Sequence, residues 1–195
     1  SARRSLETEG EGLDALVRAL SGPLGAAFAS LVELLIEAKG RVIVSGMGKS
    51  GHVARKIAAT LASTGTPSHF VHPAEASHGD LGIVTRYDVV ILFSNSGESA
   101  ELKDIIAYTQ RFAVPLAAFT AHRDSTLAKS ADVLLELPRA REACPNGLAP
   151  TTSTLLQLAL GDALAVALLE ERGFTARHFR EFHPGGKLGA ALKHA

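Results

Sequence analysis

The sequence has little that would serve a nucleic-acid-binding, membrane-binding or disulfide-stabilised protein. Its 195 residues carry 20 Lys and Arg against 20 Asp and Glu, so no net charge attracts an anionic polymer or an anionic membrane. The one cysteine, Cys144, excludes an intramolecular disulfide and a zinc site built from several cysteines. We therefore expect no nucleic-acid partner, no membrane association and a reducing, cytoplasmic location.

Export signals and bilayer spans are also missing from the sequence pattern. Acidic residues occupy the N-terminal stretch where a secretory signal needs an apolar core, so export is not indicated. The longest apolar stretch, 155–169, is interrupted by Gln157, Gly161 and Asp162, which predicts a buried helix and not a membrane span. With no Trp, two Tyr and 46% hydrophobic residues, the composition favours closely packed helices on a sheet, folded as a single domain over 1–195.

Strands alternate with helices along most of the chain. Apolar, β-branched runs predict strands at 41–45, 67–71, 88–94, 114–120 and 132–137, and amphipathic patterns predict helices at 13–20, 23–37, 51–63 and 99–112. Hydroxyl groups of 151–154 (TTST) are expected to cap a further long helix that ends near Arg172. The expected fold is therefore α/β: a three-layer αβα sandwich with a mostly parallel five-stranded sheet and two N-terminal helices.

The first candidate site follows the first strand, at 46–51 (GMGKSG). The spacing matches a dinucleotide-binding GxGxxG, but the second strand ends in Val71, His72 and Pro73 and lacks the acid that would bind a ribose. The segment does not match a Walker A loop either, because the first glycine of that motif would fall at position 43, which is Ile43. The segment predicts an anion site at a helix N-terminus, with Lys49 beside it, or a tight turn that needs glycine.

The second candidate site follows the third strand, at 94–99 (SNSGES). Three hydroxyls, one amide and one glycine before a helix suit the acceptor oxygens of a phosphate monoester, whereas simple helix capping would use one hydroxyl. Both loops follow parallel strands, so we expect them to meet at the carboxyl edge of the sheet. The pair predicts a phosphorylated ligand.

Together these segments resemble a known family. The loops GMGKSG and SNSGES, with STGTPSHFVHPAEASHGDLG between them and EACPNGLAPTTST and HPGGKLG after them, are similar to the sugar isomerase (SIS) domain of arabinose 5-phosphate isomerases over about 41–192. Members of that family commonly continue into two nucleotide-sensing CBS modules. The chain ends at Ala195, so the resemblance leads us to expect an SIS domain without those modules.

The resemblance implies interconversion of D-ribulose 5-phosphate and D-arabinose 5-phosphate, which supplies the octulosonic sugar Kdo of lipopolysaccharide. It implies a homotetramer with sites between subunits, no cofactor, and CMP-Kdo as a candidate feedback ligand. Its motifs place Lys49, Glu101, Glu142, His183 and His78 at the active site, and they place Gly48, Ser50, Ser94, Asn95, Ser96 and Ser99 around the substrate and its phosphate.

Aldose–ketose isomerisation moves a proton between C1 and C2 through an enediol, so it needs a base and a group that polarises oxygen. Among the residues that the resemblance indicates, we assign Glu142 as base, His183 to ring opening or proton shuttling, and Lys49 to polarising substrate oxygens. Glu101 would orient Lys49 or share the acid–base work, and His78 could instead bond only to backbone. Two alternatives stay open: a phosphosugar-binding sensor, and another isomerase of this fold acting on hexulose or sedoheptulose phosphates.

A metal site is a separate hypothesis. His72, His78 and His183 could supply imidazole ligands to zinc if the fold gathered them. The segment lacks the helical spacing of a metalloprotease site, and Pro73 argues against an ordinary helix there. We therefore expect no required metal. Cys144 precedes Pro145 and has no neighbouring base in the sequence, so we expect a packed thiol and not a nucleophile.

Overall fold

The sheet at the centre of the molecule is five-stranded, and every pairing in it is parallel. A computed structural model describes residues 1–182. The strands are ordered β2-β1-β3-β4-β5. Their bounds are Val42–Gly46 (β1), Ser68–Phe70 (β2), Val89–Phe93 (β3), Leu116–Thr120 (β4) and Val133–Glu136 (β5). Each expected strand overlaps an observed one and differs from it by at most two residues at either end.

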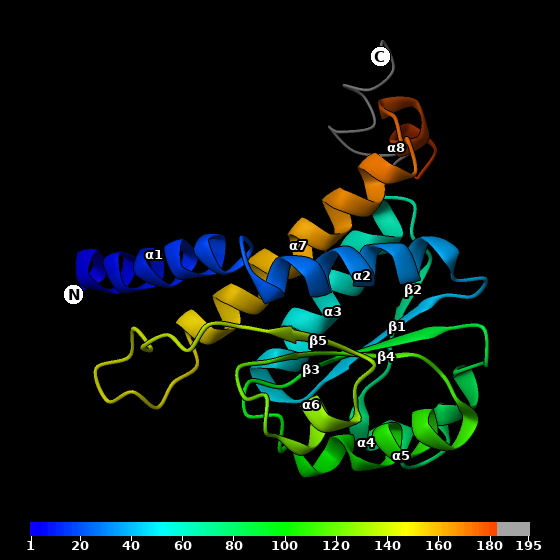
Figure 1. Ribbon diagram of the computed structural model, residues 1–195, viewed down its shortest axis with the longest axis horizontal. Helices are drawn as coiled ribbons and strands as arrows, with labels where there is room; N and C mark the ends of the chain where they lie inside the picture. The colour runs from blue at the N-terminus through cyan, green and yellow to red at the C-terminus, as the bar shows by residue number, and fades with distance from the viewer. Residues whose placement is uncertain (183–195) are drawn as a thin grey trace.

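Helices cover both faces of this sheet, which confirms the expected three-layer arrangement (Figure 1). One face carries α1 (Ala2–Ala19), α2 (Pro23–Glu37), α3 (Gly48–Ser63) and α7 (Thr152–Glu171). The other carries α4 (Pro73–Ala76), η1 (Asp80–Ile83), η2 (Ala100–Leu102), α5 (Lys103–Phe112) and α6 (Thr126–Ser130). A short helix, α8 (Ala176–Phe182), follows α7.

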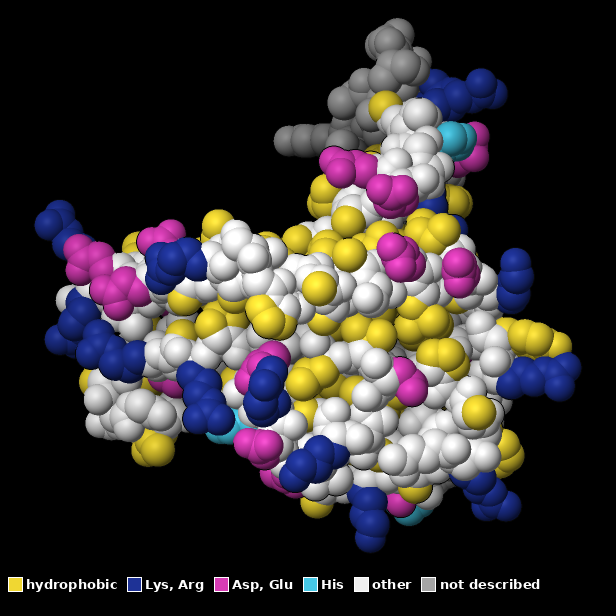
Figure 2. All heavy atoms as spheres, viewed as in Figure 1, with side chains coloured by type: hydrophobic (Ala, Val, Ile, Leu, Met, Phe, Trp, Pro, Cys, Tyr) yellow, Lys and Arg dark blue, Asp and Glu magenta, His cyan; other side chains and the backbone are white. Residues whose placement is uncertain are grey.

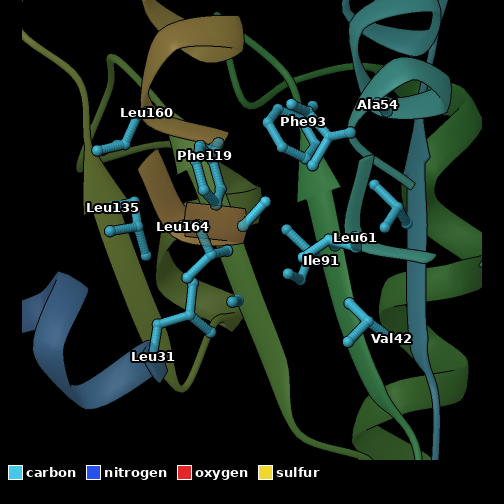
Figure 3. Packing of buried hydrophobic residues seen from close by; sticks show 14 of the residues in the cluster. Leu31, Val42, Ala54, Leu61, Ile91, Phe93, Phe119, Leu135, Leu160 and Leu164 are labelled. Carbon is cyan, nitrogen blue, oxygen red and sulfur yellow. The ribbon is translucent and has the colours of Figure 1, made fainter. Parts of the chain in front are cut away.

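Alternation along the buried strands divides the core in two. On β1, Val42 and Val44 face the α2–α3–α7 layer, while Ile43 faces the α5 layer. Figure 3 shows how side chains of α2, α3 and α7 converge on β3 and β4 in the first of these cores. There the rings of Phe93 and Phe119 stack with their centroids 4.3 Å apart. Each such side chain stabilises the fold by about 1.5–3 kcal/mol through its burial.

Helix α7 is long and apolar enough to cross a membrane by length and composition alone, but half of its most apolar window is buried inside the molecule. It packs against α1, α2 and α3. At the α3 contact, Gly161 leaves no room for a side chain, because a Cβ there would lie 2.7 Å from the Ile57 side chain. α7 is thus a core helix of this fold, as the interrupted apolar pattern predicts.

Two local expectations are wrong. The first helix begins at Ala2 and not near position 13, because its polar N-terminal half buries small residues, and a Cβ at Gly12 would lie 2.5 Å from the Thr152 side chain. Pro73 does not prevent a helix, since it occupies the first position of α4, where a missing N–H costs nothing.

Candidate active site

The sheet register brings the two predicted loops together. Gly46, the last residue of β1, pairs with Phe93, the last residue of β3. Residues 47–50 and 94–99 therefore leave neighbouring strands at the same carboxyl edge. His72 reaches this edge as well, because the preceding Val71 N–H donates to the Val44 carbonyl at 3.0 Å. The expected convergence of the two loops is confirmed.

The first loop turns directly from β1 into α3, and its glycines are required by close approaches. A Cβ at Gly46 would lie 2.9 Å from the Phe93 carbonyl oxygen, and a Cβ at Gly51 would overlap the Gly46 carbonyl. Lys49 is exposed and Ser50 half-buried, and neither side chain hydrogen-bonds to another residue of 1–182. The first turn of α3 therefore offers backbone N–H groups, a hydroxyl and an ammonium group to an anion.

The second loop, residues 94–99, is here called the serine-rich loop, and hydrogen bonds of its own serines hold its shape. The Ser94 and Ser99 hydroxyls lie 2.9 Å apart, and the Ser94 hydroxyl also accepts from the Gly97 N–H at 3.1 Å. The Ser96 hydroxyl accepts from the Glu98 N–H at 3.2 Å. Gly97 has a φ of +69°, and a Cβ there would overlap the Ser125 side chain. The result is a tight turn with three serine hydroxyls and Gly97 at the sheet edge, a composition that suits a phosphate group.

Glu98 anchors this turn to the next layer, a role that the sequence did not indicate. Its carboxylate accepts from the Thr126 N–H at 2.7 Å and from the Thr126 hydroxyl at 2.8 Å, at the start of α6. These hydrogen bonds lower the pKa of Glu98 below its usual value. Glu98 thus positions the serine-rich loop and does not face it as a free base.

Glu142 lies in the connection between β5 and α7, and a long loop (yellow in Figure 1) separates it in sequence from the start of α7, which its carboxylate contacts. Its carboxylate accepts from the Thr151 N–H at 2.7 Å, the Thr151 hydroxyl at 2.9 Å and the Ser153 N–H at 3.3 Å. Burial raises the pKa of Glu142, but the interactions with Ser153 and Thr151 outweigh it, so the pKa lies below its usual value. The expected TTST hydroxyl cap is wrong: the Glu142 carboxylate caps this helix.

The remaining predicted catalytic residues make fewer contacts than Glu142 does within residues 1–182. Lys49, Glu101 and His78 are exposed, and the ion pairs within 1–182 include none between Lys49 and Glu101. The backbone N–H of His78 donates to the Glu75 carbonyl at 2.9 Å, and this hydrogen bond holds the turn after α4. His183 lies outside the described residues. The roles assigned to these four residues stay predictions.

Two small pockets open on this edge of the sheet. One, of about 170 Å³, lies between the first loop and β2, and is lined in part by His52, Arg55 and His72. The other, of about 160 Å³, lies beside the second loop, and is lined in part by Asn95 and Ser153. The sequence assigned no ligand role to His52, Arg55 or Ser153. The sequence placed His72 directly after the second strand and named it only as a possible zinc ligand.

Metal ligands do not gather in the described part of the chain. Residues 1–182 contain no group of three or more His, Cys, Asp and Glu side chains that could hold a metal ion. His72 instead caps α4, its Nδ1 accepting from the Ala74 N–H at 3.3 Å. Because His183 is not described, the expectation of no required metal stays a prediction.

Comparisons with known proteins give one consistent result. The SIS domain family matches residues 34–167. Arabinose 5-phosphate isomerase KdsD of Pseudomonas aeruginosa is 54% identical over 192 residues, which are 98% of this chain and 58% of that protein. Arabinose 5-phosphate isomerase KpsF of Escherichia coli is 51% identical over 98% of this chain and 60% of its own length. The chain thus spans somewhat over half of these relatives.

A solved structure matches over nearly its whole length. An Escherichia coli protein in complex with arabinose 5-phosphate is 45% identical, with a TM-score of 0.87 over 94% of this chain and 95% of that one. This chain therefore has the same fold as that protein.

Proposed function

The chain belongs to the SIS domain family, and on that premise we propose that it is an aldose–ketose isomerase interconverting D-ribulose 5-phosphate and D-arabinose 5-phosphate. The observation that carries the proposal is the meeting of two loops at one sheet edge, with the Glu142 carboxylate next to Ser153 and Ser153 in one pocket with Asn95. A 45% identical protein binds arabinose 5-phosphate on the same fold, which supports this substrate.

The phosphate group of the substrate lies on the serine-rich loop and the first turn of α3. The residues proposed to bind it and the adjoining substrate atoms are Gly48, Ser50, Ser94, Asn95, Ser96 and Ser99. The ligand is a dianion while the chain has no net charge, so the attraction is local. Backbone N–H groups at a helix N-terminus, hydroxyl donors and Lys49 provide it.

Proton transfer is assigned to the Glu142 carboxylate. The carboxylate is ionised at neutral pH, and its hydrogen bonds within residues 1–182 all reach one oxygen, Oε2. Its Oε1 can therefore accept a proton from the carbon next to the carbonyl and return it to the neighbouring carbon. Lys49 stabilises the negative charge that develops on the enediolate oxygen, and His183 opens the ring or moves protons between oxygens. Glu101 and His78 complete the polar surroundings. No electron leaves the substrate, so the reaction requires no redox cofactor.

We also propose a homotetramer in which the 195 residues form one SIS domain per subunit, working in the cytoplasm on the route to Kdo, with CMP-Kdo as a feedback ligand. A groove between α2 and α7 supports association. Its apolar lining includes Phe28, Val32 and Ile36 of α2, and its charged rim consists of Glu33, Glu37, Glu170 and Glu171. Figure 2 shows hydrophobic side chains gathered over α2 and α7. Light scattering coupled to size exclusion tests the tetramer, and a monomer at micromolar concentration would contradict it.

The activity is tested by incubating the chain with ribulose 5-phosphate and following arabinose 5-phosphate against ribose 5-phosphate. Arabinose 5-phosphate alone is the expected product, with turnover unchanged by a chelator. Saturable binding of the sugar phosphate without conversion would instead make the chain a sensor. Loss of activity with chelator and recovery with a divalent ion would contradict the metal-free mechanism.

A further inference from the structure

A small pocket beside the serine-rich loop has a polar group that the described fold leaves unused. The pocket measures about 160 Å³ and lies where β3, β4 and β5 end. Asn95, His122, Arg139 and Ser153 supply its polar lining, and no carboxylate lines it. Whole-ligand pockets usually measure roughly 300–1,000 Å³. The cavity, here called the Ser153 pocket, therefore fits part of a ligand.

The Ser153 hydroxyl is the unused group. The residue is 6% exposed, and its hydroxyl has no hydrogen-bond partner within the described residues 1–182. The hydroxyl favours the charged form of the nearby Glu142 carboxylate, yet the two groups do not reach hydrogen-bond geometry. A buried hydroxyl without a partner costs free energy. Five residues within 1–182 bury an unpaired side-chain polar group, and Ser153 is the one among them that lines this pocket. A ligand hydroxyl in the pocket would give it a partner.

The neighbouring polar groups narrow the chemistry of that ligand. The Asn95 backbone carbonyl is occupied, because it accepts from the Ala121 N–H and the Thr120 hydroxyl, both at 3.1 Å. Its side-chain amide makes no hydrogen bond to another residue of 1–182 and lines the pocket. Arg139 Nε already donates to the Ala121 carbonyl at 3.3 Å. The Ser153 hydroxyl and the Asn95 amide each donate and accept, which suits the hydroxyl groups of a sugar, and Arg139 keeps its other N–H groups as donors to their oxygens.

The location of the pocket matches one end of a sugar phosphate. Asn95 belongs to the serine-rich loop, so the pocket begins where the proposed phosphate site ends. Ser153 is also the residue whose N–H donates to Glu142. A chain of hydroxylated carbons that starts at the serine-rich loop and enters the pocket would pass the carboxylate.

We propose that the Ser153 pocket binds the hydroxyl-bearing end of the sugar phosphate, with the Ser153 hydroxyl and the Asn95 amide as hydrogen-bonding groups. This inference rests on the proposed function for its substrate class, and it goes beyond it by assigning a recognition subsite and Ser153 as a binding residue.

The test is calorimetric titration of the 195-residue chain and its Ser153→Ala variant with D-arabinose 5-phosphate, and separately with inorganic phosphate. Loss of one hydrogen bond should raise the Kd for the sugar phosphate about five- to tenfold and leave that for inorganic phosphate unchanged. The melting temperature should equal or exceed that of the native chain, because the variant removes an unpaired hydroxyl.

Ser45→Ala is the matched control. The Ser45 hydroxyl is also buried and also unpaired within residues 1–182, but it lies on β1 and does not line the Ser153 pocket. This variant should bind both ligands as the native chain does.

An unchanged Kd for arabinose 5-phosphate in Ser153→Ala would overturn the proposal. So would an equal loss of inorganic phosphate binding, which would place the phosphate group in the pocket. If the native chain binds arabinose 5-phosphate without converting it, the isomerase function fails while the Kd comparison still decides the role of Ser153. If the native chain binds no sugar phosphate, both proposals fall.

Discussion

Replacing Glu142 by Gln separates its structural role from its chemical one. In the native chain this carboxylate accepts hydrogen bonds from the Thr151 N–H, the Thr151 hydroxyl and the Ser153 N–H at the start of α7. Glutamine keeps an acceptor oxygen of similar reach but loses the charge. The variant should therefore fold, with a weaker cap on α7, and should lack the base.

The size of the stability loss follows from these contacts. A negative charge at a helix N-terminus contributes about 0.3–1 kcal/mol, and charge-assisted hydrogen bonds exceed neutral ones by roughly 1 kcal/mol. The total is about 2 kcal/mol. For a chain of this length that corresponds to a fall in Tm of about 4–8 °C.

The difference in Tm between the native chain and Glu142→Gln should shrink as the pH falls. The pKa of Glu142 is lower in the folded state than its unfolded value of about 4.3, so the folded state favours the charged form. The stabilisation that the Glu142 carboxylate adds to the folded state is fully present above the unfolded pKa. It is lost as the pH falls through the lower pKa of the folded state. The native chain and Glu142→Gln should therefore differ in Tm by a constant amount near neutral pH and converge in acid.

The assay combines calorimetric melts at several pH values with turnover measured well below both melting temperatures. We expect kcat to fall by at least about a hundredfold in Glu142→Gln. Thr151→Val is the control, because it weakens the same cap and leaves the carboxylate in place. A Tm equal to the native value would refute the capping argument, and near-native turnover in Glu142→Gln would refute the assignment of the base.

Three further predictions concern the loops. Lys49→Ala should keep the native Tm but lose about a hundredfold in kcat. Lys39→Ala, at the opposite edge of the sheet, should keep the native Tm and kcat. Native turnover in Lys49→Ala would contradict the role of Lys49 in polarising substrate oxygens. Gly97→Ala should lower Tm by several degrees and weaken inhibition by inorganic phosphate, because φ is +69° there; a native melt would contradict this strain. Cys144 is half-buried, so the expectation of a packed thiol is not met. It should react with a disulfide reagent at pH 7 faster than free cysteine, since backbone N–H groups, that of Ala149 foremost, lower the pKa of its thiol; an equal rate would contradict this.

The fold was largely readable because parallel strands buried on both faces leave continuous apolar runs, as in β3 with its pattern Val89–Phe93. The first half of α1 was missed because its inward face carries Thr8 and Gly12, whose burial depends on contact with α7 and produces no apolar period. Helix α6 was missed because five residues show too little periodicity, although Ser125 does cap it. Tertiary contact, not local preference, decides such segments.

The site was predictable where strand ends fix it and unpredictable where a long loop does. Gly46–Ser50 and the serine-rich loop each follow a strand directly, so their meeting follows from parallel topology alone. The Glu142 cap depends on how residues 142–151 fold back, and no local pattern encodes that return. The unpaired hydroxyl of Ser153 is likewise invisible in the sequence, because pairing is a property of the packed structure.

The place of α7 in the chain has a consequence for synthesis on the ribosome. This helix packs on α2 and α3 and completes the core on one face of the sheet, yet it ends at Glu171, about 80 residues after β3 is complete. At about 5–20 residues per second, that face stays without its last covering layer for roughly 4–16 seconds. Every strand pair within residues 1–182 is parallel and none is a local hairpin, so a nascent chain exposes apolar strands that can aggregate during this interval. Slower growth at low temperature, or added chaperone, should therefore raise the yield of folded protein more than any change at the sheet edge.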